Sequence, residues 1–339
     1  MSENRPMKRG VLALTLAAGV VGGLAGAGSP AGIDRDTVDA HVAAARAAAG
    51  TEFAELFGLC DAPDPIPTPP SGPTPSPPPP GPPPRSEWHA EPVKVFDNLY
   101  FVGQTEYSAW AVTTSAGIIL VDALWDFSVE DEVVGGLEKL GLDPRAIKYV
   151  VVSHGHADHA GGAGYLQRRF GAHVILSAAD WDLLERDTSP WPKPRRDLIA
   201  TDGEKLTLGD TTLRLYLTPG HTPGTISTLI PVTDRGQRHL VAEWGGTGFN
   251  FTVTPERPRR YWFETYSRSA RRFREVAAKA GADALISNHP QLDGSPVKLP
   301  ALARRSPGDP HPYVVGTESV KRYLTVADEC AQAGRLRLP

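Results

Sequence analysis

The sequence predicts an α+β fold in which β-sheets are covered by helices. Apolar and charged residues make up 40% and 22% of the 339 residues, as in globular proteins. Strand-like blocks are each followed by segments with helical spacing, which favours helix-covered sheets over an all-β sandwich. The β-branched run over 147–152 is typical of a buried strand.

The first 28 residues have the pattern of a secretory signal peptide. Three basic residues lie before position 10, and residues 11–28 carry no charge. Ala25-Gly26-Ala27 is a small-x-small cleavage site, so we expect a secreted, extracytoplasmic protein with no stable membrane insertion after cleavage. A retained membrane anchor is the alternative, but the Gly- and Ala-rich core makes a poor spanning helix.

Two further segments precede the main domain. Residues 29–61 are predicted to form a short helical arm, because apolar residues recur there at helical spacing. Residues 62–85 are predicted to be a Pro-rich linker, since 14 of the 23 residues over 62–84 are proline. The remaining residues, 86–339, are predicted to form the main domain and to end in a helix.

The chain contains two cysteines, Cys60 in the arm and Cys330 in the C-terminal helix. In an oxidising compartment such a pair can close a disulfide bond, and two buried thiols are the alternative. Given the signal peptide pattern we expect the disulfide, which would tie the arm to the C-terminal helix.

Strands and helices alternate through the main domain. We expect strands at 93–102, 110–114, 117–122, 147–152, 172–176, 205–208, 213–217, 225–231, 239–242 and 284–287. We expect helices at 126–140, 161–170, 259–280 and 316–333, the first ending at Gly141 as its C-cap.

Three histidines and an aspartate are concentrated in His154-Gly155-His156-Ala157-Asp158-His159. They follow the buried strand, on an expected loop. Residues two apart on a helix point to different faces, so the helical His-Glu-x-x-His pattern of metalloproteases is excluded. Without a metal these side chains would repel one another or be costly to bury. The cluster therefore predicts a metal site.

Two further histidines, His221 and His289, stand in Gly- or Pro-containing loops that follow strands. Both would project over the carboxyl-terminal edge of a sheet. A catalytic zinc ion takes three protein ligands and keeps one position open for water. The six candidates make two such sets, so the sequence predicts two zinc ions per chain.

Together these motifs resemble the metallo-β-lactamase superfamily, over about residues 93–290. The resemblance implies a four-layer αβ/βα sandwich with a dinuclear site along one edge of its two sheets. It implies that one zinc ion is held by His154, His156 and His221, and the other by Asp158, His159 and His289. The third subclass of metallo-β-lactamases uses this set without a cysteine ligand, and the chain is most similar to that subclass.

One position departs from the family. Many members, including lactonases, glyoxalase II-type thioesterases and tRNA-processing nucleases, place a bridging aspartate between the last two histidine motifs. Here Glu243 stands near that place, one methylene longer, and Trp244 follows it. The pair also departs from the Asp-Ser common in the third subclass. A bridging Glu243 would favour lactone or ester substrates.

The resemblance implies that a hydroxide shared by two zinc ions attacks a carbonyl carbon, with Asp158 as the catalytic residue that orients it. Asp122, at a strand end, is either a partner for a ligating histidine or a strand-end cap. Five aromatic residues on or beside flanking loops are candidates for the substrate pocket, with core packing as the alternative: Trp110, Trp125, Tyr165, Trp244 and Phe249.

We therefore expect a β-lactamase-like hydrolase that opens the cyclic amide bond of a β-lactam and contributes to antibiotic resistance. A lactonase or other ester or thioester hydrolase of the same fold is the alternative, and a non-catalytic secreted binding module is a third interpretation. The net charge of −4, without a basic stripe, argues against a nucleic-acid partner. The expected partner is a small-molecule substrate.

Overall fold

The computed structural model describes residues 36–61 and 81–339, which belong to one compact unit. The predicted signal peptide (1–28), the start of the predicted arm (29–35) and most of the predicted linker (62–80) lie outside the described residues. No helix within the two described ranges is long and apolar enough to cross a membrane.

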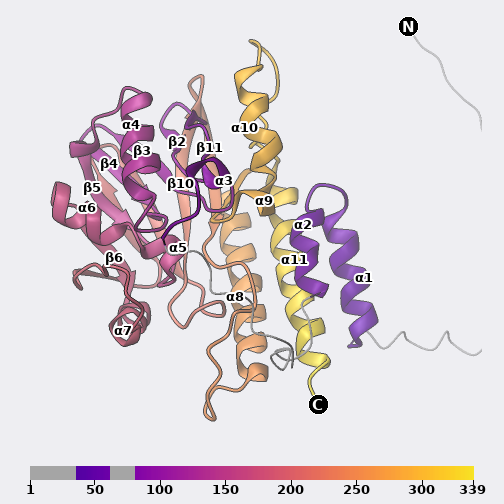
Figure 1. The fold of residues 1–339 in the computed structure, drawn as a ribbon. Helices are drawn as coiled ribbons and strands as arrows, with labels where there is room; N and C mark the ends of the chain where they lie inside the picture. The colour runs from indigo at the N-terminus through magenta and orange to yellow at the C-terminus, as the bar shows by residue number, and fades with distance from the viewer. Residues whose placement is uncertain (1–35, 62–80) are drawn as a thin grey trace, which may run out of the picture. The chain divides into compact units, whose positions relative to one another are not determined.

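Two β-sheets form the centre of this unit (Figure 1). The first has the order β1-β2-β3-β4-β5-β6-β7, antiparallel from β1 to β4 and parallel from β4 to β7. Its strands are β1 (Val93–Lys94), β2 (Leu99–Phe101), β3 (Trp110–Thr114), β4 (Gly117–Val121), β5 (Ile147–Val151), β6 (His173–Ser177) and β7 (Leu198–Ala200).

The second sheet has the order β12-β11-β10-β9-β8 and is antiparallel except for the parallel pair β11 and β12. Its strands are β8 (Glu204–Leu208), β9 (Thr211–Leu217), β10 (Ile226–Asp234), β11 (Gln237–Trp244) and β12 (Ala284–Ser287). Strands of both sheets contribute to one buried apolar cluster, which contains Val121 and Val151 of the first sheet and Leu215 and Ile226 of the second. The sheets therefore pack face to face.

Alternation along the strands explains why helices cover the outer faces. Leu120 and Val150, next to the inward-facing Val121 and Val151, belong instead to a cluster with helices α4, α6 and α7. On the second sheet, Ala242 and Trp244 pack in a cluster with α8 and α11. Burying each large apolar side chain contributes about 1.5–3 kcal/mol, so both faces of each sheet stabilise the fold. The predicted helix–sheet–sheet–helix layering is confirmed.

The covering helices differ in length on the two sides. On the first sheet lie the π-helix η2 (Glu130–Val134), α4 (Gly135–Lys139), the short helix η3 (Pro144–Ala146), α5 (Ala157–Ala160), α6 (Ala163–Phe170) and α7 (Ala178–Arg186). On the second lie α8 (Arg259–Ala280) and α11 (Thr317–Leu336), while α3 (Arg85–Trp88), α9 (Pro290–Asp293) and α10 (Ser295–Ala303) are peripheral.

The described part of the arm packs on the C-terminal helix. It consists of α1 (Val38–Ala49), α2 (Ala54–Phe57) and η1 (Gly58–Asp61), and α1 lies along α11 (Figure 1). Cys60 and Cys330 form a disulfide bond, as predicted. His41 adds a polar contact to Glu329, with 2.5 Å between Nδ1 and Oε2. The arm is thus part of the outer helical layer and belongs to the same compact unit as the sheets.

Several predicted boundaries need correction. The strand expected at 93–102 is two strands, because the backbone N–H groups of Val95 and Phe96 both donate to the carbonyl of Leu99 and make a turn. The helix expected at 126–140 begins at Glu130, and the first helix of the main domain begins at Arg85, the last residue of the predicted linker. Seven described elements of the main domain were not predicted: α3, η3, α5, α7, β7, α9 and α10.

Candidate metal centre

Six predicted ligands come from segments that end at one edge of the two sheets. His154 follows β5, His221 lies between β9 and β10, and His289 follows β12. Asp158 and His159 lie in α5 rather than on the predicted loop. The chain turns into this helix at once, because the backbone N–H groups of His159 and Ala160 both donate to the carbonyl of His156.

The first group consists of His154, His156 and His221. Nε2 of His221 is 3.1 Å from Nε2 of His154 and 3.1 Å from Nδ1 of His156. One nitrogen from each ring lies within 4.8 Å of the others. Three imidazole nitrogens at this spacing suit a single zinc ion.

The second group is formed by Asp158 and His159, whose Oδ2 and Nε2 atoms lie 3.2 Å apart, together with His154. His289 lies beside this group, with its ring centroid 5.1 Å from that of His159. The structure thus places all six predicted ligands together, with His154 between the two groups.

In four of the histidines, Nδ1 donates a hydrogen bond to an oxygen acceptor. Nδ1 of His154 donates to the carbonyl of Gly245 at 2.8 Å, that of His221 to Gly248 at 3.0 Å, and that of His289 to Glu106 at 3.0 Å. Nδ1 of His159 donates to Asp122. Such contacts fix the tautomer and orient the ring of a metal ligand. They leave Nε2 turned toward the other candidate ligands: the Nε2 atoms of His154 and His221 lie 3.1 Å apart, and that of His159 lies 3.2 Å from Asp158 Oδ2. This donor set fits zinc.

The charge states agree with this fit for four of the histidines. Burial lowers the pKa of His154 well below its usual value, that of His221 to about 3 and that of His289 to about 4, and it also lowers the pKa of His156. These rings are neutral at pH 7, the form that binds metal.

His159 behaves differently. Burial lowers its pKa, but Asp158 and Asp122 together outweigh burial and raise it to about 10. The protonated ring in turn holds the pKa of Asp158 below its usual value, against the effect of burial. A metal ion at this position must displace the proton of His159, so binding releases a proton.

Asp122 positions the His159 ring. Its Oδ2 accepts from His159 Nδ1 at 2.9 Å and from Ser153 Oγ at 2.8 Å, and its Oδ1 accepts from the Ser153 backbone N–H at 2.6 Å. Its φ of 62° lies in the left-handed region, which an aspartate tolerates better than most residues. Of the two predicted roles, the histidine partner is confirmed.

Asp180 was missed by the sequence analysis. Its Oδ2 accepts from the Gly155 backbone N–H at 2.8 Å and from Thr222 Oγ1 at 2.7 Å, so one carboxylate joins the loops that carry His154 and His221. Burial raises its pKa to about 6. No motif marks this residue in the sequence; it lies in α7, an element that was itself not predicted.

Gly245, directly after β11, must be a glycine because the backbone of Ile226 lies too close to it for a side chain. A Cβ at Gly245 would lie 1.7 Å from the carbonyl oxygen of Ile226. The Gly245 carbonyl accepts from both His154 Nδ1 and Asn288 Nδ2, so this tight contact places a hydrogen-bond acceptor behind the metal site.

Glu243 does not join the ligands. It pairs in register with Thr228 within the second sheet, is fully buried, and belongs to neither ligand group among the described residues. Burial, reinforced by Asp122, raises its pKa well above the usual value. The structure therefore gives no support to a bridging role.

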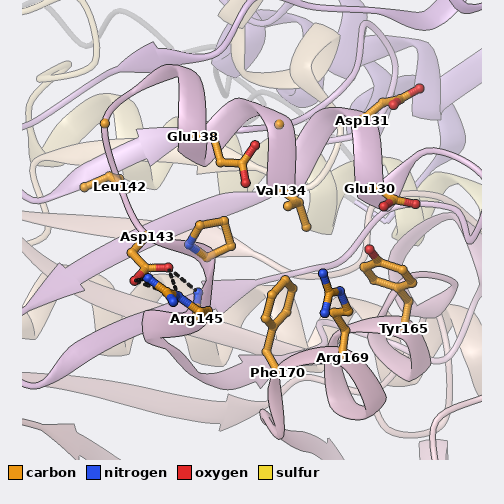
Figure 2. A pocket seen from close by; sticks show the side chains of 13 residues that line it. Glu130, Asp131, Val134, Glu138, Leu142, Asp143, Arg145, Tyr165, Arg169 and Phe170 are labelled. Atoms are coloured by element: carbon orange, nitrogen blue, oxygen red, sulfur yellow. Dashed lines mark hydrogen bonds and ion pairs between the residues drawn. The ribbon is translucent and has the colours of Figure 1, made fainter.

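The predicted substrate pocket needs correction. Trp110 and Trp244 are each 1% exposed and pack inside the apolar clusters, because their strands direct them into the core. Phe249 packs against Phe263 and Tyr266, with ring centroids 5.0 Å away in each case. Tyr165 lines a separate cavity of about 740 Å³ between η2, α4 and α6, where it lies beside Arg169 and across from Glu130 (Figure 2).

Of the five, Trp125 is connected to the candidate ligands through Tyr107, as part of a row of half-buried aromatic side chains. Tyr107 begins the row, with its ring centroid 5.5 Å from His289 and 5.8 Å from Trp125. Phe127 stacks on Trp125 at 5.9 Å, and Trp88 follows at 5.7 Å. The row gives the metal centre an apolar flank.

Comparison with known proteins agrees with this geometry. Residues 102–234 match the family model of the metallo-beta-lactamase superfamily. The crystal structure of BJP-1, a subclass B3 metallo-beta-lactamase of Bradyrhizobium japonicum, superposes with a TM-score of 0.61 and 28% identity over 71% of this chain and 91% of that one.

Two curated relatives are similar over shorter segments. Hydroxyacylglutathione hydrolase of Acidiphilium cryptum is 30% identical over 121 residues, which cover 36% of this chain and 43% of the relative. N-acyl homoserine lactonase AttM of Azorhizobium caulinodans is 29% identical over 197 residues, which cover 53% and 72%. The match thus spans less than half the length of the first relative.

Proposed function

The chain belongs to the metallo-β-lactamase superfamily, and from this premise we propose that it is a zinc-dependent hydrolase that opens the amide bond of a β-lactam ring. The observation that carries the proposal is the ligand arrangement. A three-histidine group adjoins Asp158, His159 and His289, and the buried Glu243 supplies no bridging carboxylate. The similarity to a subclass B3 enzyme supports the same substrate class.

Zinc bound to the two groups would supply a Lewis acid for the substrate carbonyl and would lower the pKa of a water molecule toward about 7. The Asp158 side chain is 19% exposed, and one of its oxygens contacts His159. Its other oxygen would accept a hydrogen bond from the attacking water, hold the proton that the water loses, and return that proton to the leaving nitrogen. Asp122 and the Gly245 carbonyl would keep His159 and His154 oriented during this step.

The aromatic row favours substrates with an apolar group next to the scissile amide. Tyr107, Trp125 and Phe127 are half-buried and contact one another beside His289. A ring or alkyl side chain stacked on such a surface gains about 0.5–1.5 kcal/mol beyond its area burial. We propose that this row holds the side chain of the lactam, and that the enzyme acts outside the cytoplasm, for which the signal peptide pattern and the disulfide bond are the support.

The test is hydrolysis of a chromogenic cephalosporin by purified protein, before and after a strong chelator and again after zinc is returned. We expect turnover that is lost with the chelator and restored by zinc. Protein that binds two zinc ions per chain but turns over no lactam would contradict the substrate, and protein that binds no zinc would contradict the metal site itself.

A lactonase is the second candidate, because one relative is an N-acyl homoserine lactonase similar over half of this chain. Acid release from an N-acyl homoserine lactone, followed at constant pH, distinguishes the two. A kcat/KM that is higher for the lactone than for the cephalosporin would assign the enzyme to ester substrates. A higher kcat/KM for the cephalosporin would support the β-lactam amide as the substrate.

A further inference from the structure

Among the described residues, Tyr107 is the tyrosine whose ring contacts the candidate metal ligands. Its ring centroid lies 5.5 Å from that of His289 and 6.2 Å from that of His159. The side chain is half-buried, so it borders both the ligands and the solvent. The proposed reaction uses its ring as part of the aromatic row but gives its hydroxyl group no role.

The loop that carries Tyr107, between β2 and β3, is fastened to the loop that carries His289. Nδ1 of His289 donates to the carbonyl of Glu106 at 3.0 Å, and the backbone N–H of Ser108 donates to the carbonyl of Asn288 at 2.9 Å. The residues on both sides of Tyr107 are therefore fixed relative to a metal ligand. A group held in this way needs little further ordering when it binds a substrate.

The hydroxyl group of Tyr107 is free to donate a hydrogen bond. The indole N–H of Trp125 donates to its oxygen, and its own O–H meets no acceptor among the described residues. Burial raises the pKa of Tyr107 above its usual value, and the charges of Asp158 and Glu106 raise it further, so the group stays protonated. A hydroxyl group that already accepts one hydrogen bond still has its O–H to offer to a substrate.

The surroundings of this hydroxyl group favour a neutral acceptor. Asp158 and Glu106 are close enough for their charges to act on it, so a carboxylate or phosphate of the substrate would be repelled there. An amide carbonyl is a strong acceptor without charge. Beyond Tyr107 the row continues with Trp125 and Phe127, which offer an apolar surface. A carbonyl followed by an apolar chain is the pattern of an acyl group.

We propose that the Tyr107 hydroxyl group donates a hydrogen bond to the carbonyl of an acylamino group on the carbon next to the scissile carbonyl. The acyl chain then lies along Trp125 and Phe127, and the substrates are N-acylated lactams or lactones rather than unsubstituted rings. The inference rests on the proposed function for the bond that is cut, but not on the choice between lactam and lactone. Penicillins, cephalosporins and N-acyl homoserine lactones all carry this acylamino group.

The experiment compares benzylpenicillin with 6-aminopenicillanic acid, which has the same ring system without the acyl group. Tyr107→Phe keeps the aromatic ring and removes the hydroxyl group. In the zinc-loaded protein it should lower kcat/KM for benzylpenicillin about 3- to 10-fold, the effect of one hydrogen bond, and leave that for 6-aminopenicillanic acid unchanged. Phe127→Ala should likewise lower kcat/KM for benzylpenicillin alone, because it removes apolar surface under the acyl chain.

Tyr165→Phe is the matched control. It makes the same chemical change at another half-buried tyrosine, which lines the separate cavity between η2, α4 and α6. It should change kcat/KM for neither penicillin.

A binding measurement separates this inference from the proposed function. The two penicillins are titrated into zinc-free protein and followed by tryptophan fluorescence. Wild type should bind benzylpenicillin more tightly than 6-aminopenicillanic acid, and Tyr107→Phe should reduce this preference about 3- to 10-fold. If the zinc-loaded protein hydrolyses neither penicillin, the proposed lactam substrate is contradicted, and the binding preference alone decides whether Tyr107 recognises the acylamino group.

Several results would overturn the proposal. With hydrolysis, these are an equal change of kcat/KM for the two penicillins in Tyr107→Phe, or no change for either. In the binding measurement, they are no preference for benzylpenicillin in wild type, or an unchanged preference in Tyr107→Phe. A weaker zinc affinity of Tyr107→Phe in a chelator competition would also overturn it, because the hydroxyl group would then support the metal centre instead of the substrate.

Discussion

At the scale of single residues, the metal centre is held mainly by the backbone. Three of the candidate ligands, His154, His221 and His289, donate a hydrogen bond from Nδ1 to the carbonyls of Gly245, Gly248 and Glu106, which no side-chain substitution removes. His159 instead relies on the carboxylate of Asp122. Side-chain control over ligand geometry is therefore concentrated at Asp122.

We expect Asp122→Asn to weaken zinc binding about 10- to 100-fold, the usual effect of losing the carboxylate partner of a ligating histidine. The amide keeps the shape of the side chain but not the charge that orients His159. The measurement is a zinc titration in competition with a fluorescent chelator.

Asp131→Asn is the control, because Asp131 is an exposed acid on η2 whose carboxylate is 3.8 Å from Arg85. Equal zinc affinity in wild type and Asp122→Asn would show that the carbonyl-held histidines alone set the geometry.

Asp180 predicts a pH dependence of stability in the metal-free protein. Burial raises its pKa from 3.8 to about 6, so folding favours the protonated form. The contribution is fully present below about pH 4 and is lost as the pH rises through about 6, a difference of about 3 kcal/mol. Asp180→Asn stays neutral and should not lose it.

The check is urea unfolding of wild type and Asp180→Asn from acid to neutral pH. The free energy of unfolding of the wild type, minus that of the variant, should fall over this range. Asp293, whose pKa burial also raises to about 6, is present in both proteins and cancels. A difference that is independent of pH would mean that Asp180 is ionised in the unfolded and the folded protein alike.

At the scale of elements, the arm is fastened to the outer helical layer. Helix α1 packs along α11, and the disulfide between Cys60 and Cys330 spans 270 residues of sequence. Closing so long a loop restricts the unfolded chain strongly, whereas the metal ligands lie at the edge of the sheets and not in these helices.

We expect the double variant Cys60→Ala/Cys330→Ala to lose about 3–5 kcal/mol of unfolding free energy in denaturant titrations while keeping its zinc content. Reduction of the wild type should reproduce the loss, and the same reductant should leave the double variant unchanged. A loss of bound zinc in the folded double variant would show that the arm supports the metal centre.

At the scale of the whole molecule, the metal centre joins both sheets. His154 follows β5 of the first sheet, whereas His221 and His289 follow β9 and β12 of the second. Residues so far apart in the sequence meet only in the folded chain, so we expect zinc to bind the folded state in preference to the unfolded one.

Zinc removal should therefore lower Tm. At free zinc about a thousandfold above Kd, the stabilisation amounts to about 4 kcal/mol, and a chelator should remove it. The measurement is calorimetry with zinc and with chelator. His154→Ala, which removes the residue shared by both ligand groups, should show a much smaller difference between the two conditions. A wild-type Tm that is the same with zinc and with chelator would contradict the metal site.

The features that the sequence determined by itself are those with a local cause. The strands at 110–114 and 284–287 and the helix at 259–280 have the predicted bounds, since apolar periodicity acts within a few residues. The candidate metal ligands could be picked out because three histidines and an aspartate in six residues have few other uses, and the structure brings them together with His221 and His289. The pairing of Cys60 with Cys330 followed from there being no other cysteine.

The tertiary structure decided what depends on neighbours distant in the sequence. A tryptophan looks the same in sequence whether its strand directs it into the core, as for Trp110, or its loop leaves it half-buried against Tyr107, as for Trp125. Asp180 joins two ligand loops only because of what packing brings near it. Hydrogen-bond satisfaction and burial are properties of the assembled chain, and no local pattern encodes them.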